Sequence, residues 1–204
     1  MKLVSDALTS VRGGRTLFMG LSFAVGGGEA LLLTGPNGAG KTTLIRTIAG
    51  LFAPAAGRVR LDGGDPERSV AEQCHYVGHL NAIKGNLSVE ENAAFWNGFL
   101  GGHADRVAAA LAAFGLDALG DVPAAYLSAG QKRRLGLARI LLAERPVLLL
   151  DEPTVSLDAT AQDMLGRAVD NHMAAGGVVV AATHVPLPIG SARELRLGQA
   201  TEVV

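Results

Sequence analysis

The sequence predicts an α/β fold with a mostly parallel sheet flanked by helices, and three observations lead to this prediction. Short apolar runs that end in polar residues alternate with segments of helical pattern, as expected for a buried parallel sheet. A glycine-rich stretch at residues 35–40 joins an apolar run to a helical segment. At 204 residues, the chain has the length of one domain. We therefore expect a single domain over residues 1–204.

The N-terminal part of the chain is expected to form an antiparallel β part. Glycines at 13–14 and 26–28 predict turns that separate short strands within residues 1–29. Residues 30–34 form a compact apolar run that fits a buried strand. Residues 42–49 have a helical pattern. A strand, a glycine-rich loop and a helix are therefore expected in that order.

A helical insertion is predicted at about residues 86–140. Ser88 and Glu91 have the spacing of a capping box, which marks the start of a helix. Val107 and Leu111 are four residues apart and fall on one helix face. The last third of the chain returns to the alternating pattern, with a strand, a helix and a strand predicted at 147–150, 159–173 and 178–182.

Composition and charge exclude several classes of protein. The net charge of −1 gives no overall attraction for nucleic acid. Cys74 is the only cysteine, so no intrachain disulfide can form. The chain shows neither a signal-peptide core nor an apolar stretch near the roughly 20 residues that cross a bilayer. We expect a soluble protein of the cytoplasm that works at a membrane only through a partner.

Residues 35–42 match the phosphate-loop pattern G-x-x-x-x-G-K-[ST]. Glycines let backbone N–H groups approach an anion closely, and the helix that follows adds its positive end. Lys41 can reach the β- and γ-phosphates, and the Thr42 hydroxyl can coordinate Mg²⁺. The loop therefore predicts binding of ATP with Mg²⁺. The expected nucleotide-binding residues here are Gly35, Pro36, Asn37, Gly38, Ala39, Gly40, Lys41, Thr42 and Thr43.

Two carboxylates follow the apolar run at 147–150. The carboxyl end of a strand in a parallel sheet lies in the crevice where ligands bind. Asp151 could hold Mg²⁺ through a water, opposite Thr42. Glu152 would then lie beside the γ-phosphate and could polarise the attacking water. The pair is a weak indication alone, and a strong one when a phosphate loop comes earlier in the chain.

Four segments together carry a resemblance to a known family. The phosphate loop, LSAGQ at 127–131, LLLDEP at 148–153 and His184 resemble, in order and spacing, the ATP-binding subunit of ATP-binding-cassette (ABC) transporters. The usual second motif is LSGGQ, so Ala129 is a mild departure. The resemblance covers essentially the whole chain. It implies an ABC-type P-loop NTPase domain and the hydrolysis of ATP.

The resemblance also implies roles for single residues. Ser128 and Gly130 would contact the γ-phosphate that another subunit binds, which implies a head-to-tail pair of two copies enclosing two ATP molecules. Asp158 matches a residue of the loop that crosses the dimer interface. His184 matches the histidine that touches the γ-phosphate and helps to orient Glu152. The expected catalytic set is therefore Glu152, His184 and Lys41.

Two positions depart from the family pattern. Where an aromatic residue normally stacks on adenine, this chain has Arg12, whose guanidinium plane can stack on a base. Where a glutamine normally faces Mg²⁺ and water, it has His79, whose neutral imidazole can accept a hydrogen bond from water. We expect both to contact the nucleotide site. For the basic run at 132–134, a solvated helix face stays an open interpretation.

The segment at 79–96, together with Arg15-Thr16-Leu17-Phe18, narrows the resemblance. It is similar to the ATP-binding subunit of the cytochrome c maturation system, a family of haem exporters. This implies ATP hydrolysis that energises haem export or handling for c-type cytochromes, with a multi-spanning membrane subunit and other cytochrome c maturation proteins as partners. It also implies a peripheral position on the cytoplasmic face of the inner membrane. Phe95 and Trp96 fit either a helical core or a partner surface, with core favoured for Phe95.

Two other functions stay open at this point. An ATPase subunit for another transported substrate would share every ATP-site residue and differ only around 79–96. A soluble ABC ATPase acting on nucleic acid would usually carry coiled coils, zinc modules or tandem cassettes, and none is visible here. We therefore expect no nucleic-acid partner. Cys74, His75 and His79 lie outside any C-x-x-C-H motif, so direct haem attachment is not expected.

Overall fold

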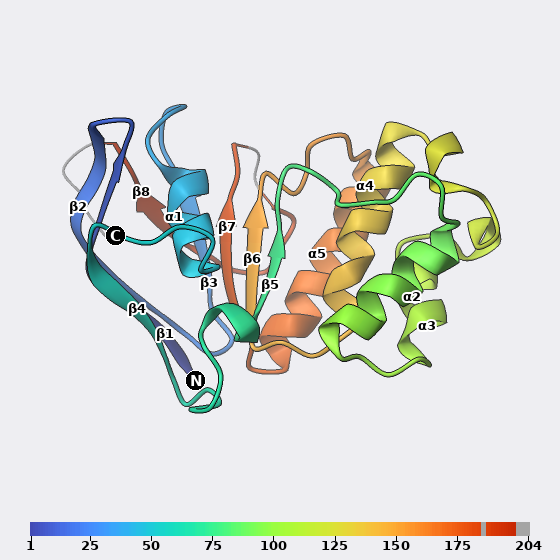
Figure 1. The fold of residues 1–204 in the computed structure, drawn as a ribbon, viewed down its shortest axis with the longest axis horizontal. Coiled ribbons are helices and arrows are strands. Elements are labelled where there is room, and N and C mark those ends of the chain that lie inside the picture. The colour runs from blue at the N-terminus through green and yellow to red at the C-terminus, as the bar shows by residue number, and fades with distance from the viewer. Residues whose placement is uncertain (185–186, 199–204) are drawn as a thin grey trace.

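The computed structural model describes residues 1–184 and 187–198. A parallel sheet stands at the centre, an antiparallel sheet lies beside it, and the helices of residues 89–138 gather at the far end (Figure 1). The strands are β1 Lys2–Arg12, β2 Arg15–Gly26, β3 Ala30–Thr34, β4 Ala56–Asp62, β5 Cys74–Val77, β6 Val147–Asp151, β7 Val178–Ala182 and β8 Arg193–Arg196. The helices are α1 Lys41–Ile48, α2 Val89–Leu100, α3 Arg106–Ala113, α4 Ala129–Ala138 and α5 Ala159–Ala174.

The parallel sheet has the strand order β5-β6-β7-β3-β8, and every neighbouring pair in it is parallel. The carboxyl ends of parallel strands meet at one edge of the sheet. That edge therefore receives the phosphate loop after β3 and Asp151 at the end of β6. Asp151 pairs in register with Ala182 of β7, so the chain leaves β7 beside the same carboxylate.

Helices cover both faces of this sheet because its strands are apolar on both sides. Along β7, Val178 and Val180 pack in a core cluster with Leu44 and Ile48 of α1. The alternate residue Val179 packs in a second cluster that includes Leu165 and Val169 of α5. All five residues of β7 are buried. A period of two along the strand thus places α1 on one face and α5 on the other.

The antiparallel sheet has the order β2-β1-β4, with β1 in the middle. Its two first strands are long, whereas the sequence predicted short ones, and the turn between them falls at the expected glycines 13–14. Leu3, Leu8 and Val25 are buried and join the cluster that also contains α1. This sheet therefore stands against the same side of the parallel sheet as the helix that follows the phosphate loop (Figure 1).

The helices α2 and α4 each begin at a serine that caps the helix. Ser88 caps α2 in a complete capping box with Glu91, so this sequence prediction is confirmed. Ser128 and Gln131 form a second capping box at the start of α4, which the sequence did not predict. No helix in the described ranges combines the length and the apolarity needed to cross a membrane.

Two features of the structure differ from the sequence predictions. β8 is a parallel edge strand beside β3, and its four residues are too few and too charged to stand out as a strand. Phe95, which was favoured as core, is 42% exposed on α2. It is Trp96 that packs inward, where its indole N–H donates to the Ala82 carbonyl and Arg139 lies over its ring.

Candidate active site

The phosphate loop begins where β3 ends and finishes where α1 begins. Gly35 and Gly40 have φ values of 125° and 101°, in the region that side chains disfavour. A Cβ added at Gly35 would lie 2.3 Å from the Leu197 carbonyl oxygen, so the turn has no room for one. The glycines therefore let the loop bring the positive end of α1 toward the space that the loop surrounds.

Lys41 points back over its own loop. Its Nζ donates to the carbonyl oxygens of Gly35 and Pro36 at 2.7 and 3.2 Å, and the residue is only 7% exposed. An ammonium group held in this position could exchange a carbonyl for a phosphate oxygen without leaving the loop. Lys41 and its loop can therefore bind the phosphates of a nucleotide.

Thr42 and Asp151 come together although they are far apart in the sequence. The Thr42 hydroxyl donates to Asp151 Oδ1 at 2.8 Å, and Asp151 is buried. Hydroxyl and carboxylate oxygens are the ligands that Mg²⁺ prefers, usually together with water and substrate phosphates. The two residues expected to hold the metal therefore lie at one point, beside the start of α1.

Glu152 and His184 form the next pair outward. Glu152 Oε1 lies 3.3 Å from His184 Nε2, and the His184 backbone N–H donates to Oε2 at 3.4 Å. Glu152 has a positive φ of 50°, and its own N–H donates to the Ala182 carbonyl. The carboxylate is partly exposed, next to a buried Asp151. The arrangement suits a base that faces water at the edge of a phosphate site.

The LSAGQ segment lies at the start of α4, where Ser128 is the helix N-cap. Ser128 is exposed, and Gly130 lies close enough to the next loop that an added Cβ would meet the Ser156 carbonyl oxygen at 3.2 Å. Asp158 caps α5 by accepting a hydrogen bond from the Ala161 N–H at 2.8 Å, which the sequence did not predict. An exposed helix start of this kind can receive an anion from outside the chain.

Comparison with known proteins decides the family. The model of the ABC transporter family matches residues 18–155. The chain belongs to the ABC transporter family. A solved ATP-binding subunit of an ABC transporter superposes with a TM-score of 0.87 at 23% identity, covering 100% of this chain and 90% of that one, and so supports the fold.

Two curated ABC relatives are similar over nearly the whole chain. Both bear the name cytochrome c biogenesis ATP-binding export protein CcmA. The one from Rhodopseudomonas palustris strain BisB5 is 56% identical over 200 residues, covering 98% of this chain and 100% of the relative. The one from Nitrobacter winogradskyi strain Nb-255 is 54% identical, with the same coverage. The predicted ABC ATP-binding fold is therefore confirmed. The resemblance to the ATP-binding subunit of the cytochrome c maturation system is confirmed as well.

Arg12 and His79, which depart from the ABC pattern at positions expected near the nucleotide, are both exposed. Arg12 ends β1, and its guanidinium lies 4.0 Å from the ring centroid of Phe52. One face of the guanidinium plane expected to stack on adenine therefore lies against a side chain of the same protein. His79 is exposed in the loop that follows β5.

Sequence reasoning missed one residue of the ABC site. Arg133 is only 3% exposed, so the solvated face left open for residues 132–134 is wrong for this position. Its guanidinium donates to the carbonyl oxygens of Glu152 and Gly78, both at 2.8 Å. Nothing in a run of three basic residues distinguishes the buried one from its neighbours. Only the fold shows which of them turns inward.

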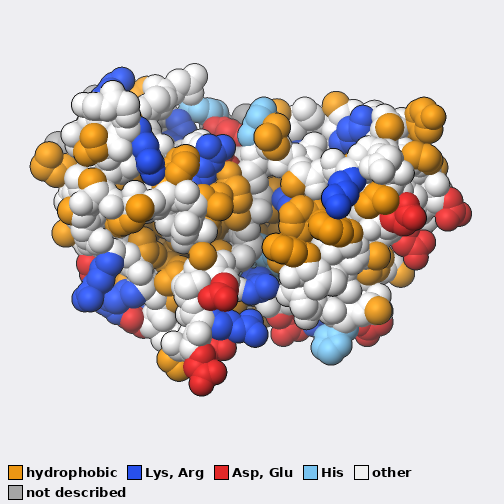
Figure 2. Space-filling view, in the orientation of Figure 1, with side chains coloured by type: hydrophobic (Ala, Val, Ile, Leu, Met, Phe, Trp, Pro, Cys, Tyr) orange, Lys and Arg blue, Asp and Glu red, His pale blue; other side chains and the backbone are white. Residues whose placement is uncertain are grey.

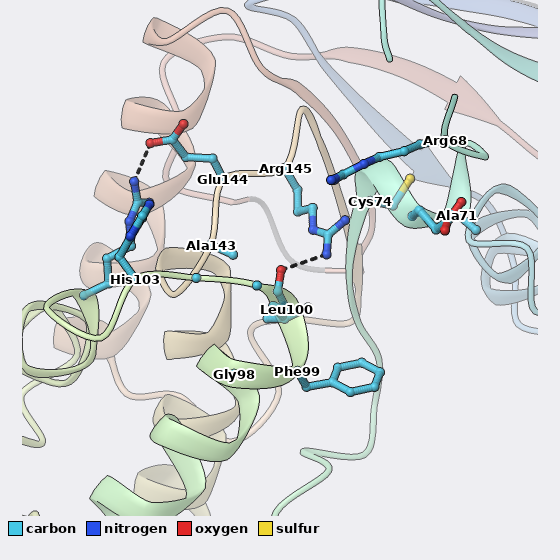
Figure 3. Close-up of a pocket in the computed structure, with 14 residues that line it drawn as sticks. Arg68, Ala71, Cys74, Gly98, Phe99, Leu100, His103, Ala143, Glu144 and Arg145 are labelled. Carbon is cyan, nitrogen blue, oxygen red and sulfur yellow. Dashed lines mark hydrogen bonds and ion pairs between the residues drawn. The ribbon is translucent and has the colours of Figure 1, made fainter. Parts of the chain in front are cut away.

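A hollow in the described part of the chain lies away from the phosphate loop. It has a volume of about 840 Å³ and is lined by the end of α2, the start of β5 and the segment before β6 (Figure 3). Arg145 reaches across it to the Leu100 carbonyl at 3.0 Å, and Phe99, on its rim, is 72% exposed. We call this hollow the α2 groove. In the surface view, hydrophobic side chains gather with lysines and arginines near the middle of the face shown (Figure 2).

Proposed function

We propose that this chain is the ATP-hydrolysing subunit of an ABC transporter complex that energises haem export or handling for the biogenesis of c-type cytochromes. The observation that carries the proposal is 56% identity over the full length of a relative named as a cytochrome c biogenesis ATP-binding export protein. An ABC transporter for another substrate would share the ATP-site residues. A soluble ATPase acting on nucleic acid finds no support in a net charge of −1.

The geometry supports the following roles at the ATP site. Lys41 and the loop N–H groups bind the β- and γ-phosphates, and Thr42 with Asp151 holds Mg²⁺, which supplies charge neutralisation on the phosphates when bound. Glu152 orients and polarises the attacking water, and His184 fixes the carboxylate and contacts the γ-phosphate. The protein contributes positioning and electrostatic stabilisation, which dominate phosphoryl transfer.

Each chain supplies half of two sites in this proposal. Ser128 and Gly130 stand on an exposed helix start, and the Asp158 cap lies at the start of α5. A second copy, related head to tail, would bring these residues to the γ-phosphate on the first copy's loop. Closure of the pair around two ATP molecules would move the membrane partner, and hydrolysis would reopen it.

We propose that the α2 groove receives a cytoplasmic segment of the multi-spanning membrane subunit. Phe99 lines the groove and is 72% exposed, and Phe95, four residues earlier on the same helix, is 42% exposed. Arg68 and Arg145 line the same groove as Phe99. A segment with apolar side chains and a carboxylate fits this surface. Through it, the chain would lie on the cytoplasmic face of the inner membrane as one domain, with its helical part at about residues 86–140 facing that subunit.

The experiment replaces the proposed base in the complex purified from its native membrane. Glu152→Gln keeps the size of the side chain and removes the carboxylate that polarises water, so we expect ATP binding to persist while turnover falls at least about a hundredfold. Cells with only this variant should lose haem-stained c-type cytochromes. Turnover within a few-fold of wild type would remove Glu152 from its role. If Glu152→Gln loses turnover but the cells keep normal c-type cytochromes, the chain is an ABC ATPase without a role in cytochrome biogenesis.

A further inference from the structure

Arg133 reaches two separate segments of the chain from the second turn of α4. Its Nε donates to the Pro153 carbonyl at 3.1 Å, and Nη2 donates to the Glu152 carbonyl at 2.8 Å. Its Nη1 donates to the Gly78 carbonyl at 2.8 Å and to Asn81 Oδ1 at 3.1 Å. Four hydrogen bonds therefore join α4 to the turn after β6 and to the loop after β5.

This set of contacts requires an arginine. A guanidinium has five N–H donors in a fixed plane, while a lysine ammonium has three donors at one point and cannot span four acceptors on two segments. Arg133 is buried, and its acceptors are neutral carbonyl and amide oxygens. Burying a charge without a directly paired carboxylate is unfavourable, so each of these hydrogen bonds offsets a real cost.

The first segment that Arg133 holds carries the proposed base. Glu152 has a left-handed backbone, a conformation that a residue with a side chain keeps only when its surroundings enforce it. Its N–H is held by the Ala182 carbonyl of β7, and its carbonyl oxygen is held by Arg133. The backbone is thus fixed on both sides of the Cα atom that carries the carboxylate facing His184.

The second segment carries His79, and the helix itself carries the LSAGQ motif. The loop at 78–81 packs closely on α4, since a Cβ added at Gly136 would meet Asn81 at 3.1 Å. Ser128 caps the same helix one turn before Arg133. One side chain therefore joins α4 to the loop of His79 and to the backbone of Glu152.

We propose that Arg133 is a positioning residue that couples the LSAGQ helix of a chain to the Glu152 carboxylate of the same chain. The inference rests on the proposed function, in which the LSAGQ motif contacts ATP on a second copy. ATP held by one copy's loop would then act, through the other copy's α4 and Arg133, on the base of the other site. The two ATP sites are thereby linked in hydrolysis, while Arg133 itself touches no nucleotide.

The test compares Arg133→Lys with Arg134→Lys in the purified complex. Arg134 is the next residue of α4, and it donates to the carbonyl oxygens of Phe114 and Gly115 instead. We expect Arg133→Lys to lower kcat at least about tenfold and to reduce the Hill coefficient for ATP toward one, while KM for ATP stays within about threefold. Arg134→Lys should keep both kcat and the Hill coefficient near wild type.

A second pair of variants keeps the inference testable if Arg133→Lys does not fold. Asn81→Ala removes one acceptor of Arg133, whereas Asn81→Asp keeps an Oδ1 acceptor in a side chain of the same size. We expect the alanine variant to lose kcat about threefold or more and the aspartate variant to retain it. Full kcat and cooperativity in folded Arg133→Lys, or equal kcat in the two Asn81 variants, would overturn the inference. If Glu152→Gln still abolishes turnover in that case, the proposed function stands and only the coupling fails.

Discussion

Individual residues at this site hold conformations that local preference opposes. A left-handed backbone at a residue with a side chain costs about 1–2 kcal/mol, and Glu152 adopts one at φ 50°. Its neighbours enforce it through the Ala182 carbonyl and the Arg133 guanidinium. The strain therefore lies at the residue whose carboxylate must be aimed, which is where strained backbones often occur in active sites.

His75 should make the stability of the protein depend on pH. Burial lowers the pKa of His75 from 6.5 to about 4, although its Nε2 bonds the Ala143 carbonyl. As pH falls below the ordinary value, the unfolded chain binds a proton that the folded chain does not, so stability is full above it and is lost down to about pH 4. We expect a loss on the order of 3 kcal/mol, measured by urea unfolding at several pH values.

Two variants check this assignment. His75→Gln should be less stable overall but should show a flatter dependence of unfolding free energy on pH. His103→Gln removes a histidine from an exposed position and should leave the slope as in wild type. An unchanged slope in His75→Gln would contradict the assignment. Burial also lowers the pKa of His172, so a smaller slope in the same direction should remain.

At the scale of single residues, the sequence predicts a functional role where that role depends on neighbours close in the sequence. The phosphate loop is one continuous segment of the sequence, and Asp151 and Glu152 are adjacent residues in another. The fold brings the Thr42 hydroxyl to 2.8 Å from Asp151 Oδ1. Arg133 could not be predicted, because its four acceptors come from distant segments. Its neighbours in the basic run have the same charge, and burial alone separates them.

Among the elements, α2 exposes aromatic side chains that we expect a partner to cover. Phe99 is 72% exposed and packs edge-to-face on Trp96, so its ring covers little of the core. We expect Phe99→Ser to weaken co-purification of the chain with its membrane subunit about tenfold, because a buried aromatic side chain in an interface often contributes more than 1 kcal/mol. Thermal stability should be nearly unchanged, since an exposed site changes stability little.

A second exposed side chain provides the control for this surface. Met19 is 73% exposed on β2, so Met19→Ser removes a similar area from the antiparallel sheet. It should leave co-purification intact. Equal loss in both variants, or none in Phe99→Ser, would show that the α2 groove is not where the membrane subunit docks.

The elements also show what periodicity can and cannot predict. The strands at 30–34 and 178–182 agree with the structure residue for residue, because apolar runs of that length suit a strand covered on both faces. β8 escaped prediction, since its pairing comes from β3 and its own four residues are mostly charged and exposed. Phe95 was assigned to the wrong side of α2, because Trp96 next to it fits the core equally well by spacing.

In the proposed function, the molecule as a whole presents half of an ATP site. Its phosphate loop, Asp151, Glu152 and His184 gather at one edge of the parallel sheet. Ser128 lies exposed at the start of α4, as the N-cap of a helix. A helix start with free access can bind an anion from a second molecule. In the proposed function, two copies therefore complete each other's sites around ATP.

The most direct test is the mass of the chain in solution with and without ATP and Mg²⁺, measured by light scattering during gel filtration. Glu152→Gln should trap the closed pair, so its mass should double when the nucleotide is added. Adding Ser128→Asp keeps a good helix cap but places a negative charge against the partner's phosphates. The double variant should bind ATP and stay monomeric. A Glu152→Gln chain that is saturated with ATP and remains a monomer, or a Ser128→Asp chain that still pairs, would contradict the account.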